Sequence, residues 1–119
     1  MMAAHNTTGL QGEMLAADYL TANGYDILYR NWRCSYYETD IIADKNGVLH
    51  FIEVKTRHSV RFGYPEEAVN SKKFGNLKKC AVLFLALHPG WKRIQFDILS
   101  IIQSRKNNPE FFLIEDVWI

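Results

Sequence analysis

Apolar residues recur at helical spacing in two segments of the chain, and start and stop signals bound each segment. In the first, Thr8 followed three residues later by Gln11 resembles a capping box, and Asn23-Gly24 supplies a stop. A first helix is therefore expected between these signals. In the second segment, Ser71 can cap a helix that ends at Pro89-Gly90. The positions expected to face the core are Leu10, Ala17 and Leu20 in the first helix, and Phe74, Leu77, Ala81 and Phe84 or Leu85 in the second.

The remaining hydrophobic pattern is typical of strands. In the stretch 91–102, apolar residues alternate with polar ones, and Asp97 is expected to face solvent as one of the polar set. The order of helix, three strands, helix and strand predicts a single α/β domain over residues 1–119. The expected strands are residues 25–33, 38–43, 48–56 and 91–102, with a last edge strand at 111–114 and 117–118.

Charged residues interrupt the two apolar strands that flank Asn46-Gly47. Asn-Gly between hydrophobic runs is a strong signal for a two-residue hairpin turn, because both residues tolerate the positive φ that the turn requires. With these residues at the centre of the turn, Lys45 faces Val48, and counting back along both arms sets the register. The two opposed pairs of charged side chains, expected to share one face, are Asp40 with Glu53 and Glu38 with Lys55.

Direct opposition of Asp40 and Glu53 needs an explanation, because like charges about 5 Å apart repel. One explanation is a divalent cation between the carboxylates, and another is a shared proton that raises the pKa of one of them. Such oxygen ligands suit Mg²⁺ or Mn²⁺. Lys55 would lie beside the ion and could contact a phosphate oxygen or stabilise an attacking hydroxide. Glu38 would orient Lys55 rather than bind the ion.

A plainer interpretation fits the same residues. The acids can be solvated at the end of the hairpin, with Glu38 and Lys55 as an exposed cross-strand ion pair worth about 0–1 kcal/mol. Against it, Ile42 and Phe51 continue the same face, so the charged end borders apolar packing. The pattern alone leaves both interpretations open.

Asp40 followed by the triplet Glu53-Val54-Lys55 resembles the D…ExK signature of the restriction-endonuclease-like nuclease superfamily. The wider chain resembles the YraN family of uncharacterised proteins, which are predicted nucleases related in fold to Holliday-junction resolvases. This resemblance implies an αβββαβ core with a mixed central sheet flanked by helices. The matching segments are residues 9–13 with Ala16, 19–20, 24–25, 28–33, 38–43, 51–57, 68–69 with Lys73 and Leu77, and 96–97.

The resemblance implies a role for each residue of this signature. Asp40 and Glu53, joined by the Val54 carbonyl, would bind the metal, and Lys55 would be the catalytic lysine. It also implies that Glu13 approaches the metal site as a base or as a ligand through water. Glu13 lies in the apolar stripe of the first helix, where a carboxylate is unusual. Otherwise Glu13 would reach solvent or interact with the helix N-terminus.

Composition sets further bounds. At 119 residues and 48% hydrophobic content, the chain is long enough to bury one core. No stretch approaches the roughly 18 apolar residues of a membrane helix, and the polar start lacks a signal-peptide core. A cytoplasmic location without membrane contact is therefore expected. Cys34 and Cys80 lack metal-binding spacing, and the four histidines are scattered, so neither residue type supports a metal cluster.

The net charge of +1 gives little indication of a nucleic-acid partner, but the distribution of charge along the chain gives more. Residues 30–79 hold ten Lys and Arg against six acids, a difference of +4, which is a modest footprint for a phosphate backbone. Arg57, Arg61 and Lys73 are candidate phosphate contacts, and Phe62 or Tyr64 could stack on a base. The same segment can instead be a connector with its aromatics against the core, and the lysines can be solvated helix residues.

These observations support a leading function and two alternatives. The leading hypothesis is a Mg²⁺- or Mn²⁺-dependent phosphodiesterase that acts on DNA, including branched or damaged DNA, and the resemblance adds a homodimer because junction resolution needs two active sites. Tyr37 and Thr39 depart from the family pattern, which has a glycine and a hydrophobic residue there, and Tyr37 adds bulk near the site. With the low net charge, they motivate a non-catalytic nucleic-acid-binding module. A third, weaker hypothesis is a protein-interaction domain whose acids form surface salt bridges.

Overall fold

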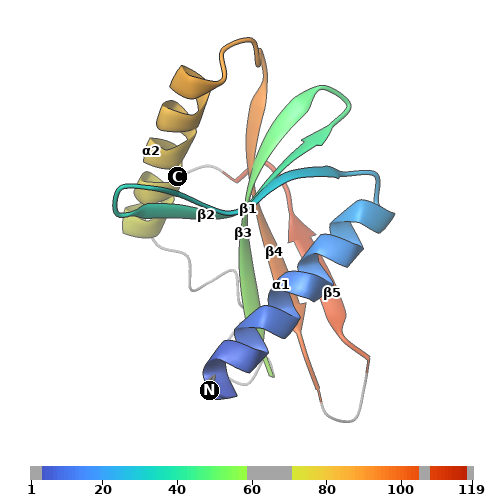
Figure 1. The fold of residues 1–119 in the computed structure, drawn as a ribbon. Coiled ribbons are helices and arrows are strands. Elements are labelled where there is room, and N and C mark those ends of the chain that lie inside the picture. The colour runs from blue at the N-terminus through green and yellow to red at the C-terminus, as the bar shows by residue number, and fades with distance from the viewer. Residues whose placement is uncertain (1–3, 59–70, 105–107, 118–119) are drawn as a thin grey trace.

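The chain builds one sheet with a helix on each face. The computed structural model describes residues 4–58, 71–104 and 108–117. Within these residues five strands form a single sheet, and two helices cover its opposite faces (Figure 1). The elements in chain order are α1 (Ala4–Ala22), β1 (Asp26–Cys34), β2 (Tyr37–Lys45), β3 (Val48–Arg57), α2 (Ser71–Leu87), β4 (Ile94–Ile102) and β5 (Glu110–Ile114).

The strand pairing is mixed. The order across the sheet is β1-β2-β3-β4-β5, with β3 and β4 parallel and the other neighbours antiparallel. Helix α2 lies in the connection between the two parallel strands, which cannot be joined by a tight turn. The predicted α/β fold, a mixed sheet flanked by helices in this element order, is therefore confirmed. Neither helix in the described ranges is long and apolar enough to span a membrane.

Helix α1 ends at Ala22, directly before the predicted stop signal Asn23-Gly24. Gly24 has a φ of 90°, and its N–H donates to the Thr21 carbonyl at 3.2 Å. The N–H of Tyr25 donates to the Leu20 carbonyl at 3.0 Å, which completes a Schellman motif around the left-handed glycine. The predicted start was wrong, because the helix begins upstream and Thr8 lies inside it rather than at its N-cap.

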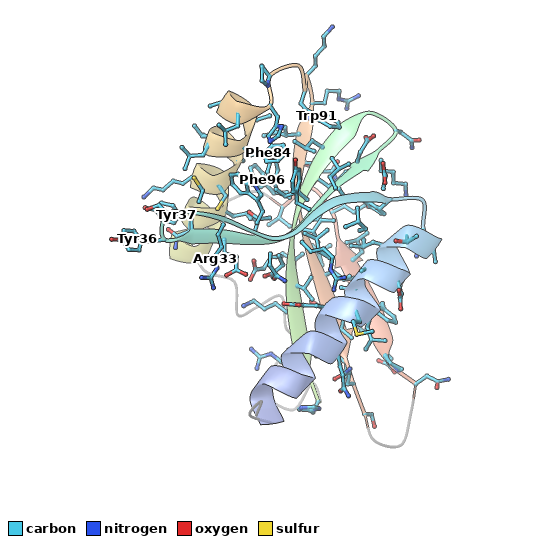
Figure 2. The ribbon with its side chains drawn as sticks, viewed as in Figure 1. Arg33, Tyr36, Tyr37, Phe84, Trp91 and Phe96 are labelled. Carbon is cyan, nitrogen blue, oxygen red and sulfur yellow. The ribbon has the colours of Figure 1, made fainter. Side chains whose placement is uncertain are left out.

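Both faces of the sheet are covered, which explains why every residue of β3 from Leu49 to Glu53 is buried. Figure 2 shows Phe84 and Phe96 between α2 and the sheet, and the Phe84 ring stands edge-on to Trp32 with centroids 5.3 Å apart. The α1 stripe is centred on Ala16 and Leu20, because the predicted Ala17 is only half-buried. The core on the α1 face includes Ala16, Leu20, Tyr25, Ile41, Ala43, Ile52, Leu99 and Ile101. The core on the α2 face includes Ile42, Leu49, Phe51, Leu77, Ala81 and Phe84.

The outward direction predicted for Asp97 was wrong. Asp97 is fully buried, and every residue from it to the end of β4 is buried, whereas Ile94 is 38% exposed. Strand β4 lies between β3 and β5, with a helix covering each face of the sheet, so most of its length has no solvent side. In a strand that is covered on both faces, an alternation of apolar and polar residues does not indicate that the polar ones face solvent.

Candidate active site at the fork between β2 and β3

The predicted hairpin register is confirmed along its first five pairs. Asn46 and Gly47 both have positive φ, of 54° and 82°, as the turn requires. The Asp44 carboxylate accepts a hydrogen bond from the Gly47 N–H at 3.0 Å and stabilises the turn. The paired positions run from Lys45 with Val48 to Ile41 with Ile52.

Strand pairing stops one step before the two acids. The ladder between β2 and β3 ends at Ile41 and Ile52, so Asp40 and Glu53 are not a strand pair. Asp40 Oδ2 instead accepts the backbone N–H of Val54 at 2.8 Å. A side-chain carboxylate thus replaces the next rung of the ladder, and the two strands diverge beyond it.

The alternation of side chains is broken at this point on both β1 and β2. Ile41 packs on the α1 face, but Thr39, two residues earlier, lies against Cys80 of α2. On β1, Tyr29 and Trp32 both pack against Phe84 although they are three residues apart. The breaks coincide with Asp40 and with Asn31, whose φ is 53°. The expectation of one regular face was therefore wrong for the strand pairing and for Glu38, whereas Asp40 and Lys55 line one pocket and Glu53 contacts Lys55.

The backbone of β3 also faces the fork. The N–H and C=O of one strand residue point to the same side, and consecutive residues alternate between the two neighbouring strands. The Arg57 carbonyl accepts the N–H of Gln103 on the β4 side, at 2.8 Å. Val54, three residues earlier, donates toward Asp40 on the β2 side. The Val54 carbonyl consequently points toward the fork.

A pocket of about 330 Å³ occupies this fork. Three elements contribute to it, because Glu13 comes from α1, Asp40 from β2 and the remaining residues from β3. Two acids and a lysine therefore meet in one open, polar space. We call this the fork pocket, and the residues that line it are Glu13, Asp40, Val54, Lys55 and Thr56.

Lys55 and Glu38 form different ion pairs from the one predicted. Lys55 Nζ lies 3.7 Å from Glu53 Oε1, and both side chains are largely shielded from solvent. Glu38 Oε2 lies 3.3 Å from Arg33 Nε, its cross-strand neighbour on β1. The predicted Glu38–Lys55 pair was therefore wrong, because the broken alternation directs Glu38 toward β1. Glu53 now takes the place next to Lys55 that was expected for Glu38.

Asn31 is a residue of the site that sequence reasoning missed. Its Nδ2 donates to Glu13 Oε2 at 3.2 Å, across eighteen positions of chain. Its left-handed backbone is a conformation that asparagine tolerates better than most residues. The same backbone break thus shapes the fork and fixes the Glu13 carboxylate at its edge. An asparagine inside an otherwise regular strand was the available signal.

The two departures from the family pattern lie on the α2 side of the sheet. Thr39 is fully buried beside Cys80, and burial raises the pKa of the Cys80 thiol. Tyr37 packs beside α2, where its hydroxyl accepts a hydrogen bond from Lys79 Nζ at 3.3 Å. The bulk of Tyr37 is thus directed toward α2 and not into the fork pocket.

The predicted phosphate-binding residues are only partly described. Arg57 is half-buried in the last position of β3, directly after the fork residues. Lys73 belongs to the first turn of α2, but its side chain lies outside the described residues. Arg61, Phe62 and Tyr64 also lie outside them.

The donor set of the fork is one that hard cations prefer. Its side chains offer carboxylate oxygens, and the Val54 carbonyl offers a backbone oxygen, which suits Mg²⁺ or Mn²⁺ better than zinc or copper. A carboxylate has about four acceptor positions, so the bond from Val54 orients Asp40 without exhausting it. Among the described residues, no three His, Cys, Asp or Glu side chains gather into a metal cluster. Since Mg²⁺ usually takes only one or two protein carboxylates, this donor set fits it.

Comparison with known proteins places every residue of the fork within a matched region. Residues 12–101 match the family described as "Uncharacterised protein family UPF0102". A UPF0102 protein of Syntrophomonas wolfei is 52% identical over 79% of this chain and 83% of its own length. Another, of Caldicellulosiruptor bescii, is 43% identical over 92% of this chain and 95% of its own length. A third, of Dictyoglomus thermophilum, is 46% identical over 82% of this chain and 83% of its own length.

Proposed function

This chain belongs to the UPF0102 family, which confirms the predicted membership of the YraN family, and on its fork pocket we propose a function. We propose that the protein is a divalent-metal-dependent phosphodiesterase that acts on DNA. The observation that carries the proposal is the meeting of Glu13, Asp40 and Lys55 in one open pocket where the β2–β3 ladder stops. Acids beside a lysine at an accessible break in a sheet can bind and polarise a phosphate diester. The D…ExK resemblance supports the same chemistry.

Each side chain has a task that follows from its contacts. The Lys55 ammonium can bind a phosphate oxygen and neutralise charge that grows in the transition state. Glu53, at 3.7 Å from Lys55, holds that ammonium at the pocket. Glu13, whose Oε2 is held by Asn31, can accept a proton from the attacking water.

Asp40, Glu53 and the Val54 carbonyl are the groups that would hold Mg²⁺ or Mn²⁺. A bound divalent cation would supply Lewis-acid polarisation of the phosphate. The hydrogen bond from Val54 fixes Asp40 at the fork before any ligand arrives. We further propose that the fold belongs to the restriction-endonuclease-like superfamily, an assignment supported by the αβββαβ element order.

The test is cleavage of labelled junction, flap and duplex DNA in the presence of Mg²⁺ or Mn²⁺. Wild type should cleave at least one substrate, and Asp40→Ala or Lys55→Ala should reduce the rate by about 10²–10³-fold or more, the typical cost of losing one electrostatic group. Lys92→Ala is the matched control, because Lys92 is exposed and lies before β4, at the opposite end of β3 from Lys55. Equal cleavage by wild type and both fork variants would overturn the assignment.

A second candidate is a nucleic-acid-binding module that retains the fork without catalysis. The Lys55–Glu53 ion pair favours it, because each charge already has a partner of opposite sign. Calorimetric titration with Mn²⁺ separates the candidates. A phosphodiesterase should bind Mn²⁺ and lose that binding in Asp40→Ala, whereas the module should bind DNA in a salt-dependent way that Asp40→Ala leaves unchanged.

A further inference from the structure

The tip of the β1–β2 hairpin exposes aromatic surface to solvent. Tyr36 is 97% exposed in the turn between the two strands, and Figure 2 shows it pointing away from the body of the protein. The preceding Ser35 has a φ of 58°, so the turn holds the backbone in a specific left-handed conformation. A large aromatic side chain at such a tip gains almost nothing from burial in this chain.

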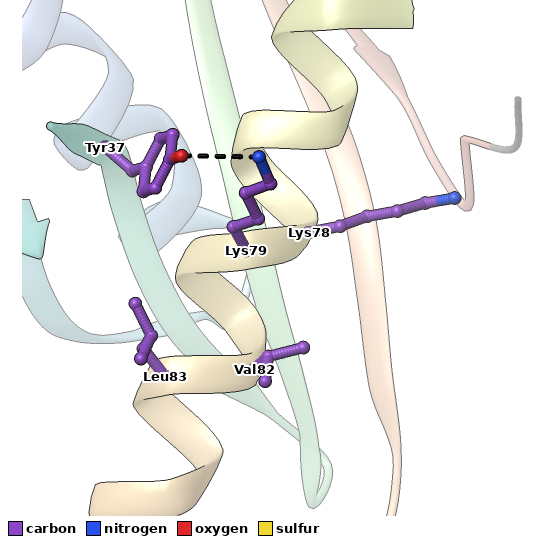
Figure 3. Close-up of a pocket in the computed structure, with 5 residues that line it drawn as sticks. All are labelled: Tyr37, Lys78, Lys79, Val82 and Leu83. Carbon is purple, nitrogen blue, oxygen red and sulfur yellow. Dashed lines mark hydrogen bonds between the residues drawn. The ribbon is translucent and has the colours of Figure 1, made fainter.

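A groove lies beside the same hairpin, on α2. Its volume is about 370 Å³, and it is lined by Tyr37, Val82, Leu83 and two lysines (Figure 3). Lys79 Nζ is 3.3 Å from the Tyr37 hydroxyl and 5.1 Å from the centre of the Tyr37 ring. Val82 is 67% exposed, so the floor of the groove is apolar and open. We call this the Tyr37 groove, lined by Tyr37, Lys78, Lys79, Val82 and Leu83.

The charge around the groove is positive. Helix α2 contributes Lys78 and Lys79 to the groove, and its sequence contains no Asp or Glu. Arg33, 76% exposed, lies one pair from the tip of the hairpin, outside the groove, and its charge is paired with that of Glu38. Aromatic and apolar surface with cations at its rim is the combination that binds single-stranded nucleic acid, because bases stack and phosphates pair with the cations.

The groove is connected to the fork pocket through strand β2. Tyr37 precedes Asp40 by three residues, a separation of about 10 Å at the rise of a strand. Because the groove lies on the α2 side of the sheet and Glu13 on the α1 side, a DNA strand that reaches both would have to pass through the open end of the fork.

We propose that the hairpin tip and the Tyr37 groove bind an unpaired nucleotide segment of the DNA whose phosphate enters the fork pocket. Tyr36 supplies the stacking surface, the groove accepts an apolar base face, and Lys78 and Lys79 contact the flanking phosphates. This proposal rests on the proposed function and specifies its substrate as DNA with a single-stranded segment beside the scissile bond.

A second copy of this chain fits the groove less well. A two-fold contact places the same patch on both partners, so the lysines of one copy would approach those of the other. Like charges facing each other across an interface are unfavourable. A polyanion has the opposite charge and satisfies the same lysines.

Binding without metal tests the surface separately from cleavage. Fluorescence anisotropy in EDTA would compare a labelled oligothymidine with a duplex of equal length, for wild type, Tyr36→Ala and the double variant Lys78→Ala/Lys79→Ala. Wild type should prefer the single strand, and Tyr36→Ala should weaken that binding roughly tenfold, as expected for the loss of one stacked base. The lysine variant should lower the slope of the salt dependence by roughly 0.7 for each phosphate that it no longer neutralises.

The matched control is Lys92→Ala/Arg93→Ala, which removes two exposed cations before β4. The proposed surface would be overturned if Tyr36→Ala bound the single strand as tightly as wild type does. It would also be overturned if the lysine variant and the control variant had the same salt dependence of binding. Sedimentation that shows a dimer disrupted by Val82→Asp, with no single-strand binding, would overturn it in favour of a second copy. If Tyr36→Ala loses binding while Asp40→Ala still cleaves, the surface stands and the proposed function fails. If cleavage requires Asp40 but Tyr36→Ala binds the single strand as wild type does, the proposed function stands and the surface fails.

Discussion

Strand β3 carries two buried polar sites of opposite character. His50 and Glu53 are three residues apart, and both are at least nine-tenths buried. Around His50, polar groups are satisfied within the protein. Around Glu53, the polar groups border an open pocket. The comparison separates polar residues that stabilise the fold from those available to a ligand.

The site at His50 is a closed network centred on Asp97. His50 Nδ1 lies 2.6 Å from Asp97 Oδ2, while Gln95 Nε2 and the Asp116 N–H donate to Asp97 Oδ1 at 2.8 and 2.9 Å. The Tyr25 ring covers the His50 ring edge-on at 5.0 Å. The network fixes the segment after β5 to the core, so its chemistry is structural. We call it the Asp97 network: His50, Gln95, Asp97 and Asp116.

The fork pocket differs because its polar groups come from strands that have separated. The Val54 N–H and the Asp40 carboxylate meet across a gap where a ladder would otherwise continue. Lys55 and Glu13 approach from β3 and α1 without closing that gap. Buried polarity alone therefore does not identify a functional site, and access to a pocket is the additional requirement.

The largest predicted effect is on stability, from Asp97→Ala. The substitution removes three interactions and leaves His50 buried without its partner, so unfolding should become easier by about 3 kcal/mol or more. Urea denaturation followed by tryptophan fluorescence measures this change. The control is Asp40→Ala, which should cost less than half as much because Asp40 borders an open pocket. Equal losses of stability would contradict the division into structural and functional sites.

The next effect comes from the contact between α1 and the fork. A Cβ added at Gly12 would lie 2.5 Å from Thr56 Oγ1, so Gly12→Ala should push the helix and Glu13 away from β3. Overpacking of this kind costs about 1–3 kcal/mol. In Gly75→Ala, on α2, the new Cβ meets nothing within 4 Å, and helix propensity should stabilise the protein instead.

Both effects can be read from the same urea denaturation series. Thr56→Ala removes the obstructing oxygen and should restore most of the stability lost in Gly12→Ala. If Gly12→Ala and Gly75→Ala shift the unfolding midpoint in the same direction, close packing of α1 on the fork is refuted.

The sequence predicts the parts of the molecule that depend on local chemistry. Asn46-Gly47 favours a two-residue turn, and the geometry of that turn sets the register of the adjacent strand pairs. Gly24 ends α1 because it readily adopts the left-handed conformation that the end of the helix requires. The break at Asn31 and Asp40 depends on how β1 and β2 pair with each other. The alternation of apolar and polar residues within one strand carries no information about that pairing. Burial of Asp97 depends on neighbours that are distant in sequence, among them His50 of β3 and Asp116 after β5.

Asn31 should affect activity more than stability. Asn31→Gly keeps the left-handed backbone but removes the amide that holds Glu13 Oε2, so kcat should fall about tenfold while KM changes little. Asn31→Ala should add a cost of about 1–2 kcal/mol for the unfavourable φ. Asn46→Gly, at a φ of 54° in the hairpin turn, is the control and should leave kcat unchanged. Loss of kcat in both glycine variants would show that the effect is general loosening of the sheet.

The smallest effect is a pH dependence at Tyr25, which packs against His50 of the Asp97 network. Burial, followed by the charges of Asp97 and Glu115, raises the pKa of the Tyr25 phenol far above its ordinary value of about 10. The folded state therefore retains the Tyr25 proton at a pH where the unfolded state loses it. Stability should be unaffected below pH of about 10 and fall as the pH rises beyond it.

Tyr25→Phe should remove part of that alkaline loss, since phenylalanine has no proton to retain. Urea midpoints measured between neutral and alkaline pH provide the test, and Tyr36→Phe is the control because Tyr36 is almost fully exposed. If both variants have the same alkaline profile as wild type, the Tyr25 proton contributes nothing to stability. A selective change in Tyr25→Phe would instead assign the alkaline loss of stability to the buried Tyr25 phenol.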